Sequence, residues 1–509
     1  MIRSSSFLLA ALLALLPLLS GCYLHRDAAS LRVTIAVPAL PDTLDPHVID
    51  DPATRYVHAA VFDALTSVDE HGEVQPALAT EWRPLGPTSW EFKIRQNVRF
   101  QNGEELNAHT VVFNVRRVLR PDLHSPVLKD IPTLIRANTR DLHTVVLTTR
   151  RPDPILPRRL AALYIAPVEY LQRVGETAFG AQPSGTGPWK VAKFVPGDSL
   201  TLEARKGAWR AVPQSRTIEL RLVPDPAARV EALATGQVDV ALDLPPAQRD
   251  PLRAQGLYVY EAPVSAARMV ILDTTSDDAP LKNVKVRQAL NYAVDKDFLL
   301  DTIGGAGIPL DGQVVGREAN GYSDRVQYDY RYNPAEAERL MAEAGYPNGF
   351  PLTIYYTQSP DDRERRELMA LAQDLSYIRV RVQLQGTDRT AHLKRRVGGT
   401  LTPAFYETLP YYPSQDASLV MEFFGLEKTE TLSPTYDNDD FDEIYKLTHS
   451  EFNQSIRSQA LRISMGILAE FPPAIYLYQP LRLHATQPGI LDFQALPNLL
   501  FDFDRLRHS

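Results

Sequence analysis

A single cysteine, Cys22, stands directly after an apolar run near the start of this chain of 509 residues. With one thiol the chain can form no internal disulfide, so a buried apolar core has to hold the fold. The run, Phe7–Leu19, follows the positively charged Arg3 and is 13 residues long. A transmembrane helix needs about 20 apolar residues, so this charged start, short run and small-residue break predict a secretory signal peptide.

The break reads Leu19-Ser20-Gly21-Cys22 and resembles the bacterial lipobox, in which the cysteine is acylated and the preceding peptide is removed. An ordinary signal peptide with a chance cysteine is the alternative. Acylation predicts a mature chain that begins at Cys22, with a short tether over 23–30. It also predicts that lipid holds the protein on the periplasmic or extracytoplasmic face of a membrane of the cell envelope. No other stretch is long and apolar enough to span a bilayer.

Length and charge limit the class of protein. The 54 basic and 62 acidic residues give a formal charge of −8, and they form no basic stripe, so nucleic acid is not an expected partner. At roughly 100–200 residues per domain, the chain is long enough for two to four domains with a large core.

Strand-like and helix-like segments alternate, which predicts a mixed α/β fold. Period-two alternation predicts strands over 31–37, 90–95, 143–148, 189–195, 199–204, 217–223, 238–242 and 257–261. Asp225-Pro226 and Asn333-Pro334 supply an N-cap and an N1 proline, so helices are predicted to begin there and to end at Gly236 and Gly345. The apolar stripe of VRQALNYAVDKDFL predicts another helix from Val286 onward.

Motifs of catalytic chemistry are absent from the sequence. It contains no H-E-x-x-H, C-x-x-C, G-x-S-x-G or G-x-x-x-x-G-K-S/T pattern. The acidic stretch 436–443 resembles a cation loop but lacks the central glycine and spaced Glu of an EF-hand, so a solvated acidic turn is preferred. We expect a protein that is not an enzyme, with no catalytic residue, no metal site and no cofactor.

Several motifs follow one another in an order that one family shares. They are Leu44-Asp-Pro46, Phe62-Asp-Ala-Leu65, the block from Trp90 to Val111, Ser184-Gly-Thr-Gly-Pro-Trp189, Val286–Asp295, and Tyr332-Asn-Pro334 with Ala344-Gly-Tyr346. The chain is similar in this order to the solute-binding lipoproteins of peptide/nickel-type ABC importers, a family that includes oligopeptide and dipeptide receptors. The resemblance covers nearly all of the predicted mature chain, and the lipobox agrees with it independently.

The resemblance implies a two-lobed periplasmic-binding-protein fold with a hinge and a subdomain inserted in the first lobe. Lobe I would comprise 23–62, 184–266 and 480–509, the insertion 63–183, and lobe II 267–479. The hinge would lie near Ala267–Leu272 and Tyr476–Arg482. The resemblance implies a monomer that closes on a small-molecule or peptide ligand and then binds an ABC permease and its ATPase. A lipid anchor on Cys22 would attach this monomer to the membrane.

In this family the ligand meets a lobe II segment of the form W-x-A-D-Y-x-D-P, which corresponds here to 405–416. The aspartate that meets a peptide's ammonium falls on Tyr411, and an arginine used for the ligand's carboxylate falls near Ser359. Without these charges, the resemblance implies a ligand held by stacking and hydroxyl contacts, such as a sugar, a capped peptide or a modified peptide. Alternatively, Asp416 or Glu407 supplies the charge.

The clustered Tyr406, Tyr411 and Tyr412 are the main candidates for ligand contact, and core packing of the loop is the alternative for each. Four other residues are candidates, and three of them have a structural alternative. They are Asp416 in the same loop, Thr186 in the Gly185–Gly187 turn, Asp45 after the first strand and Arg268 at the predicted hinge. A tight turn for Thr186, a cap or turn for Asp45 and a surface ion pair for Arg268 are the structural roles expected instead.

The expected function is delivery of a peptide or peptide-like solute to a membrane permease. Two alternatives stay open: an envelope sensor or chaperone without transport, and a ligand other than a free peptide, including a metal chelate. A secreted enzyme of the same fold is the least favoured reading because no nucleophile or metal motif is present.

Overall fold

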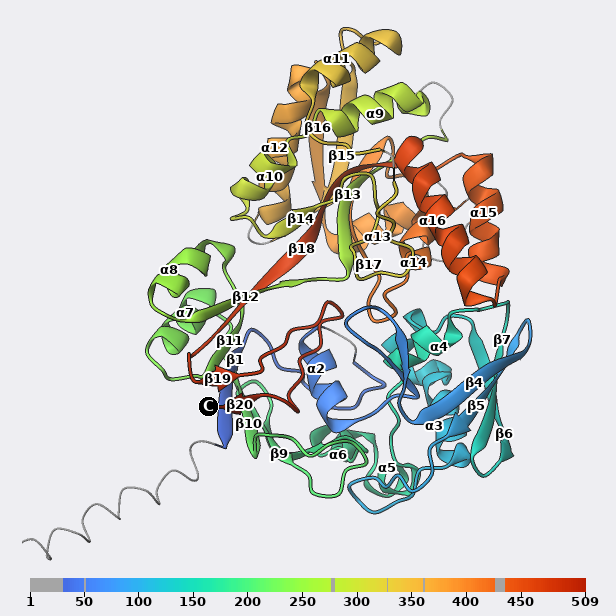
Figure 1. The fold of residues 1–509 in the computed structure, drawn as a ribbon, viewed down its shortest axis with the longest axis vertical. Helices are drawn as coiled ribbons and strands as arrows, with labels where there is room; N and C mark the ends of the chain where they lie inside the picture. Colours follow the sequence, from blue (N-terminus) through green and yellow to red (C-terminus); the bar gives the residue numbers. More distant parts are fainter. Residues whose placement is uncertain (1–30, 50–51, 276–279, 327, 360–361, 426–434) are drawn as a thin grey trace, which may run out of the picture.

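The computed structural model describes residues 31–49, 52–275, 280–326, 328–359, 362–425 and 435–509 (Figure 1). The predicted signal peptide, Cys22 and the tether lie outside these residues. Strand β18 (Ala474–Thr486) runs through both halves of a 12-stranded sheet. One end of β18 pairs with β13 (Ala266–Leu272) and β14 (Gly307–Pro309), and the other end pairs with β11 (Val240–Leu244) and β12 (Tyr258–Pro263).

We call the half of the sheet that contains β11 lobe I. Its strand order is β11-β1-β10-β9-β8, in which β1 (Arg32–Val37) is parallel to β10 and β11. The remaining elements of lobe I are β8 (Trp189–Val195), β9 (Ser199–Ala204), β10 (Thr217–Leu222), β19 (Ile490–Leu491), β20 (Arg507–His508), α2 (Pro52–Val61), α7 (Pro226–Ala234) and α8 (Arg249–Ala254). Helices α5 (Val168–Val174) and α6 (Glu176–Ala181), from the segment before β8, pack against the lobe I core.

The half that contains β13 is called lobe II, and its strand order is β16-β15-β17-β13-β18. Its other elements are β15 (Pro351–Thr357), β16 (Arg381–Thr387), β17 (Ala404–Pro410), α9 (Val284–Tyr292), α10 (Lys296–Thr302), α11 (Pro334–Glu343), α12 (Arg363–Tyr377), α13 (Arg389–Val397), α14 (Ser418–Met421), α15 (Asp439–Ser450) and α16 (Gln454–Glu470). Val270 of β13 packs into one apolar cluster and Met269 into another, so both faces of this sheet are buried.

Between β1 and β8 the chain forms a separate four-stranded antiparallel sheet, which we call the inserted subdomain (Figure 1). The strand order is β4-β5-β7-β6, and α3 packs against it over one apolar core. Its elements are β4 (Ala79–Gly86), β5 (Ser89–Ile94), β6 (Leu134–Asp141), β7 (Thr144–Thr149), α3 (Ala108–Val118), α4 (Leu156–Arg159) and the hairpin strands β2 (Thr66–Val68) and β3 (Val74–Pro76).

The predicted helix starts are correct where a cap marks them. The carboxylate of Asp225 accepts from the amide of Ala228, and the amide oxygen of Asn333 accepts from that of Glu336. The helix predicted from Val286 onward is in fact two helices, α9 and α10. Asp295 ends the first run because its carboxylate accepts from the amide of Phe298 and so caps a new helix.

The acidic stretch 436–443 forms the start of helix α15. The Asn438 side chain caps this helix, and Asp439, Asp440 and Asp442 occupy its first turn, where the positive end of the helix dipole stabilises carboxylates. Across the described residues, no three His, Cys, Asp or Glu side chains are grouped so that they could hold a metal ion. No helix in this part of the chain is long and apolar enough to cross a membrane.

Candidate functional site

The loop that follows β17, residues 411–416, lies where lobe II meets lobe I and the inserted subdomain. Arg158 of α4 donates from Nη1 to the carbonyl of Ser414 at 3.3 Å. The guanidinium of Arg55 lies 5.0 Å from the centre of the Tyr412 ring. Tyr412 is half-buried against Val264, Ala266 and Leu499, so three parts of the chain that are distant in sequence meet at this loop.

Tyr411 is fully buried at the same junction, and its hydroxyl binds the lobe II segment 316–318 at two points. The hydroxyl donates to Oε1 of Glu318 at 2.8 Å and accepts from the amide of Gly316 at 2.8 Å. Burial, and after it the charge of Glu318, raises the pKa of Tyr411 well above its usual range. The phenol therefore acts as a neutral donor that fixes the position of Glu318.

Glu318 is half-buried, and Oε1 accepts two more hydrogen bonds. Gln479 of β18 donates from Nε2 at 2.8 Å, and Ser265, between β12 and β13, donates from Oγ at 3.2 Å. On the lobe I side, Gly72 has φ +73° and sits so close that a Cβ there would lie 2.4 Å from the Glu318 carbonyl oxygen. The hairpin turn of the inserted subdomain thus packs directly against the segment that carries Glu318.

Asp416 lies behind this junction in a fully buried ion pair. Arg457 of α16 donates to both carboxylate oxygens, at 2.8 and 2.7 Å, and Nε of Arg158 is 3.8 Å away. Burial opposes the charge of Asp416, but Arg457 and then Arg158 hold its pKa well below the usual range. The carboxylate is therefore already compensated by protein cations.

Tyr406 and Arg268 contact each other inside lobe II. Arg268 donates from Nη1 to the Tyr406 hydroxyl at 2.7 Å and to Oε2 of the buried Glu367 at 2.9 Å. Burial favours the neutral form of Glu367, but the charge of Arg268 and the bond from Tyr406 keep its pKa below the usual range. The ion pair of Arg268 is thus a buried one, not the surface pair expected as its structural alternative.

Asp45 lies in lobe I next to the inserted subdomain, which supplies its cationic partner. Arg117 of α3 donates to both carboxylate oxygens, at 2.9 and 2.6 Å. Burial opposes ionisation, but the hydrogen bonds and the charge of Arg117 lower the pKa of Asp45. The backbone amide of His47 also donates to Asp45, so the expected turn is present together with the ion pair.

The His47 ring is buried beside Asp45 in a neutral form. Nδ1 lies 2.9 Å from Nη1 of Arg117 and accepts from it, so the proton is on Nε2, which donates to the carbonyl of Tyr164 at 2.8 Å. Burial, helped by the charge of Arg117, lowers the pKa of His47 to about 4.

This geometry predicts a loss of stability in mild acid. The unfolded chain protonates its histidines near pH 6.5, whereas burial lowers the pKa to about 4 for His47 and His484 and to about 3 for His449. Between pH 6.5 and 4 the unfolded state binds more protons, so the free energy of unfolding falls as the pH falls. Burial raises the pKa of Asp374 to about 6, so in this range the folded state binds one proton at Asp374 that the unfolded state does not. This single group opposes the effect of the three histidines.

We expect the melting temperature to drop by several degrees between pH 7 and pH 4.5, measured by scanning calorimetry. His47→Gln should flatten this dependence, whereas His109→Gln, on the exposed side of α3, should leave it unchanged. A melting temperature that stays constant over this range in the natural chain would contradict the prediction.

Thr186 is buried in the turn between α6 and β8. Its hydroxyl donates to Oδ2 of Asp63 at 2.7 Å, and Trp209 donates to the same oxygen at 2.8 Å. At Gly185 a Cβ would lie 1.9 Å from the carbonyl oxygen of Val61, so this position needs glycine for close approach of the backbone. The turn therefore fixes α2 against β8.

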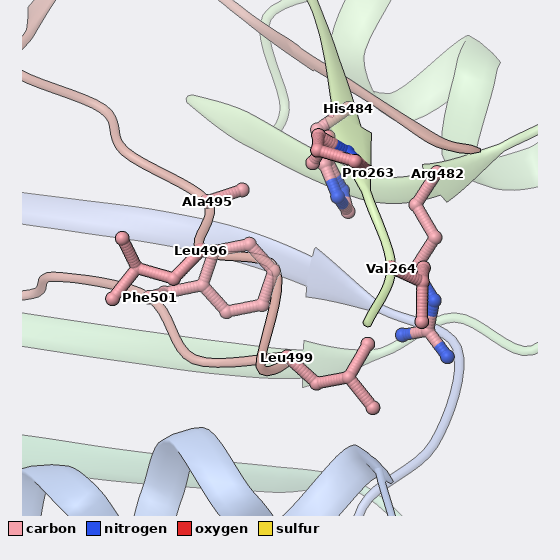
Figure 2. Close-up of a pocket in the computed structure, with 9 residues that line it drawn as sticks. Pro263, Val264, Arg482, His484, Ala495, Leu496, Leu499 and Phe501 are labelled. Atoms are coloured by element: carbon pink, nitrogen blue, oxygen red, sulfur yellow. The ribbon is translucent and has the colours of Figure 1, made fainter. Parts of the chain in front are cut away.

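A small apolar hollow adjoins the junction on the lobe I side. Its wall includes Val264, Arg482, His484, Leu496, Leu499 and Phe501. Figure 2 shows the Phe501 ring across from His484 and Arg482 of β18 and from Val264, which follows β12. Because Val264 precedes Ser265 and packs with Tyr412, the hollow and the polar groups around Glu318 share one border.

The structure brings together Tyr411, Tyr412 and Asp416 at the junction, and Tyr406 with Arg268 inside lobe II. Asp45 and Thr186 lie in two separate clusters of lobe I and the inserted subdomain. Sequence reasoning missed Ser265, Glu318 and Gln479, which converge on one point from separations of 53 and 161 residues. Glu318 lies in a polar segment that matches no motif, so only its position in the fold identifies it as a candidate site residue.

Known proteins resemble the chain over most of its length. The sequence pattern of the bacterial extracellular solute-binding proteins, family 5 Middle, matches residues 73–429. The glutathione-binding protein GsiB of Salmonella typhimurium (strain LT2) is 28% identical over 382 residues, which are 74% of this chain and 73% of that protein.

Solved structures are also similar. HbpA2 from Haemophilus parasuis has a TM-score of 0.85 at 21% identity, and the match covers 94% of this chain and 100% of the HbpA2 chain. The periplasmic murein tripeptide binding protein MppA, in its unliganded open form, has a TM-score of 0.82 at 18% identity. This match covers 94% of the present chain and 98% of the MppA chain. These likenesses confirm the predicted mixed α/β, two-lobed fold.

Proposed function

Because the chain belongs to the bacterial extracellular solute-binding proteins of family 5, which serve peptide and nickel ABC importers, we propose that it captures a peptide or peptide-like solute between its lobes and delivers it to a membrane permease. The relatives are substrate-binding proteins of ABC transporters and not enzymes, which agrees with the expectation from the missing catalytic motifs.

The junction at loop 411–416 supports this proposal most strongly. Polar and aromatic groups of both lobes meet there, and β18 and the β12–β13 connection are the chain crossings beside it. A solute that contacts both lobes stabilises their closed arrangement and shifts the population toward it. We propose the hinge at Ala267–Leu272 and Tyr476–Arg482, and the lobe limits 23–62, 184–266 and 480–509 for lobe I, 63–183 for the insertion and 267–479 for lobe II.

For the ligand contacts we propose that the half-buried Tyr412 faces the solute at the junction and that the fully buried Tyr411 contributes by holding Glu318 in place. Tyr406, Arg268, Asp416, Thr186 and Asp45 then act through the groups that they hold in place. The names of GsiB and MppA, a glutathione-binding and a murein tripeptide binding protein, favour a short peptide or a modified peptide.

We also propose that Cys22 is acylated and anchors a monomer to a membrane of the cell envelope. This would keep the receptor close to its permease. The mass of the N-terminal peptide from membrane-extracted protein tests this part, because acyl chains on a residue 22 N-terminus add a defined mass.

The central experiment is native mass spectrometry on the chain from residue 23 onward, purified from the envelope of its host, combined with small-angle scattering. We expect a co-purified mass that leaves on denaturation, and a smaller radius of gyration when the purified ligand is returned. Uptake of this solute should stop when the permease is deleted. A chain that retains no solute and never compacts with a pool of short peptides would refute the proposal.

A further inference from the structure

We propose that Glu318 is the anion that receives the positively charged end of the solute, so that the ligand carries a free primary ammonium group. This inference rests on the proposed function and narrows it from peptide-like solutes to uncapped ones. It replaces the expectation that the ammonium partner is missing from the chain.

The first reason is the hydrogen bonding of Glu318. All three donors to this carboxylate are neutral groups, Tyr411, Gln479 and Ser265, and all three bind Oε1. Oε2 accepts no hydrogen bond from the described residues, and no basic side chain in that part of the chain pairs with Glu318. Its neighbour Arg317 is directed to Asp324, at 2.8 Å. The carboxylate is thus oriented through one oxygen while its charge is uncompensated.

The second reason is that the two carboxylates that the sequence offered for this role, Asp416 and Glu407, already have cationic partners. Asp416 is paired with Arg457 at 2.7 Å. Glu407 lies 3.1 Å from Nη1 of Arg396 and 3.4 Å from the ring of His392. A cationic ligand gains most from an anion whose charge the protein has left unmatched, and this condition singles out Glu318.

The third reason is an unsatisfied acceptor beside Glu318. The Gln415 side chain is fully buried and donates from Nε2 to Oγ of Ser265 at 3.2 Å, while its Oε1 has no hydrogen-bond partner. Ser265 in turn donates to Glu318, so the amide and the carboxylate flank the same hydroxyl. A buried acceptor without a donor is costly, and an ammonium, which has three N–H groups, can satisfy both acceptors.

The location also suits the end of a chain-like solute. Glu318 is half-buried, and the Gly72 turn packs against its backbone from the opposite lobe. An N-acetyl cap would remove the charge and add bulk where the carboxylate is already surrounded.

The test uses two peptide pools with the full chain from residue 23 onward. One pool contains random tri- to pentapeptides with free N-termini, and the other contains the same peptides after N-acetylation. Binding is followed by native mass spectrometry and by the shift of the melting temperature. The variants are Glu318→Gln and, as a matched half-buried control, Glu407→Gln, whose parent carboxylate is already paired.

We expect the natural chain and Glu407→Gln to retain members of the free pool and to bind the acetylated pool about 30- to 5,000-fold more weakly, which is the range for removing one partner of a buried charge pair. Glu318→Gln should bind the free pool as weakly as the natural chain binds the acetylated one, with a melting temperature within a few degrees of the natural chain's.

Three other results would overturn the inference, and they differ in which part of the proposal they leave intact. Equal binding of both pools by the natural chain, or full binding of the free pool by Glu318→Gln, would remove Glu318 from ammonium recognition and leave the peptide receptor intact. Retention of neither pool would refute the peptide receptor itself, and the role of Glu318 with it.

Discussion

Arg457→Met is expected to lower the free energy of unfolding by about 3–5 kcal/mol, the usual cost of removing one partner from a buried ion pair. Arg457 and Asp416 are both fully buried, and the guanidinium also donates from Nε to the carbonyl of Thr448 at 2.7 Å. Its loss leaves Asp416 with Arg158 as the nearest cation, at 3.8 Å, and disconnects α16 from the end of α15. Urea denaturation followed by circular dichroism measures the change.

Arg462→Met is the matched control because it makes the same substitution on an exposed position of α16. This variant should differ from the natural chain by less than about 0.5 kcal/mol. The double variant Asp416→Asn with Arg457→Met should recover part of the loss, since it removes the charge left unpaired. Similar unfolding midpoints for Arg457→Met and Arg462→Met would show that the buried pair does not stabilise the fold.

Arg158→Met is expected to weaken binding of the free-terminus peptide pool by about tenfold to hundredfold, as for the loss of one or two hydrogen bonds from a charged donor. Arg158 donates to the carbonyl of Ser414 in lobe II and to that of Gly72 in its own subdomain, so it fixes the two against each other. Without it the closed arrangement is less populated, and the apparent affinity falls with that population. Isothermal titration calorimetry measures the change in affinity.

Scattering separates this effect from unfolding. Arg158→Met should keep its circular dichroism spectrum, because Asp416 retains Arg457, but it should show a larger radius of gyration with ligand than the natural chain does. Arg173→Met, an exposed position of α5, serves as the control and should bind like the natural chain. Unchanged affinity for Arg158→Met would show that this bridge does not contribute to closure.

Local signals in the sequence were sufficient wherever structure depends on neighbouring residues. The Asp225 and Asn333 caps and the alternating strands could be predicted because their causes lie within a few residues. The break between α9 and α10 was missed, although Asp295 carried the cap signal, because the apolar stripe continued through it. Family motifs supplied the two-lobed architecture, which no local pattern encodes.

The candidate site was predictable only in part. The loop with Tyr411 and Tyr412 was found through its family motif, and it does lie at the lobe junction. The tyrosine pattern could not show that Tyr411 is fully buried and bonded to Glu318, 93 residues away in the sequence. A single polar residue in an irregular segment gains its significance only from the distant groups that the fold brings to it.

The course of β18 has a consequence for how the protein is made. This strand lies between β13 and β14 in lobe II and between β11 and β12 in lobe I, and it begins only at residue 474 of 509. A nascent chain therefore lacks a central strand of both halves until residues 474–486 have been made. A product truncated before residue 474 would have no half able to finish its sheet, so the two halves complete their sheets with the same segment of the chain.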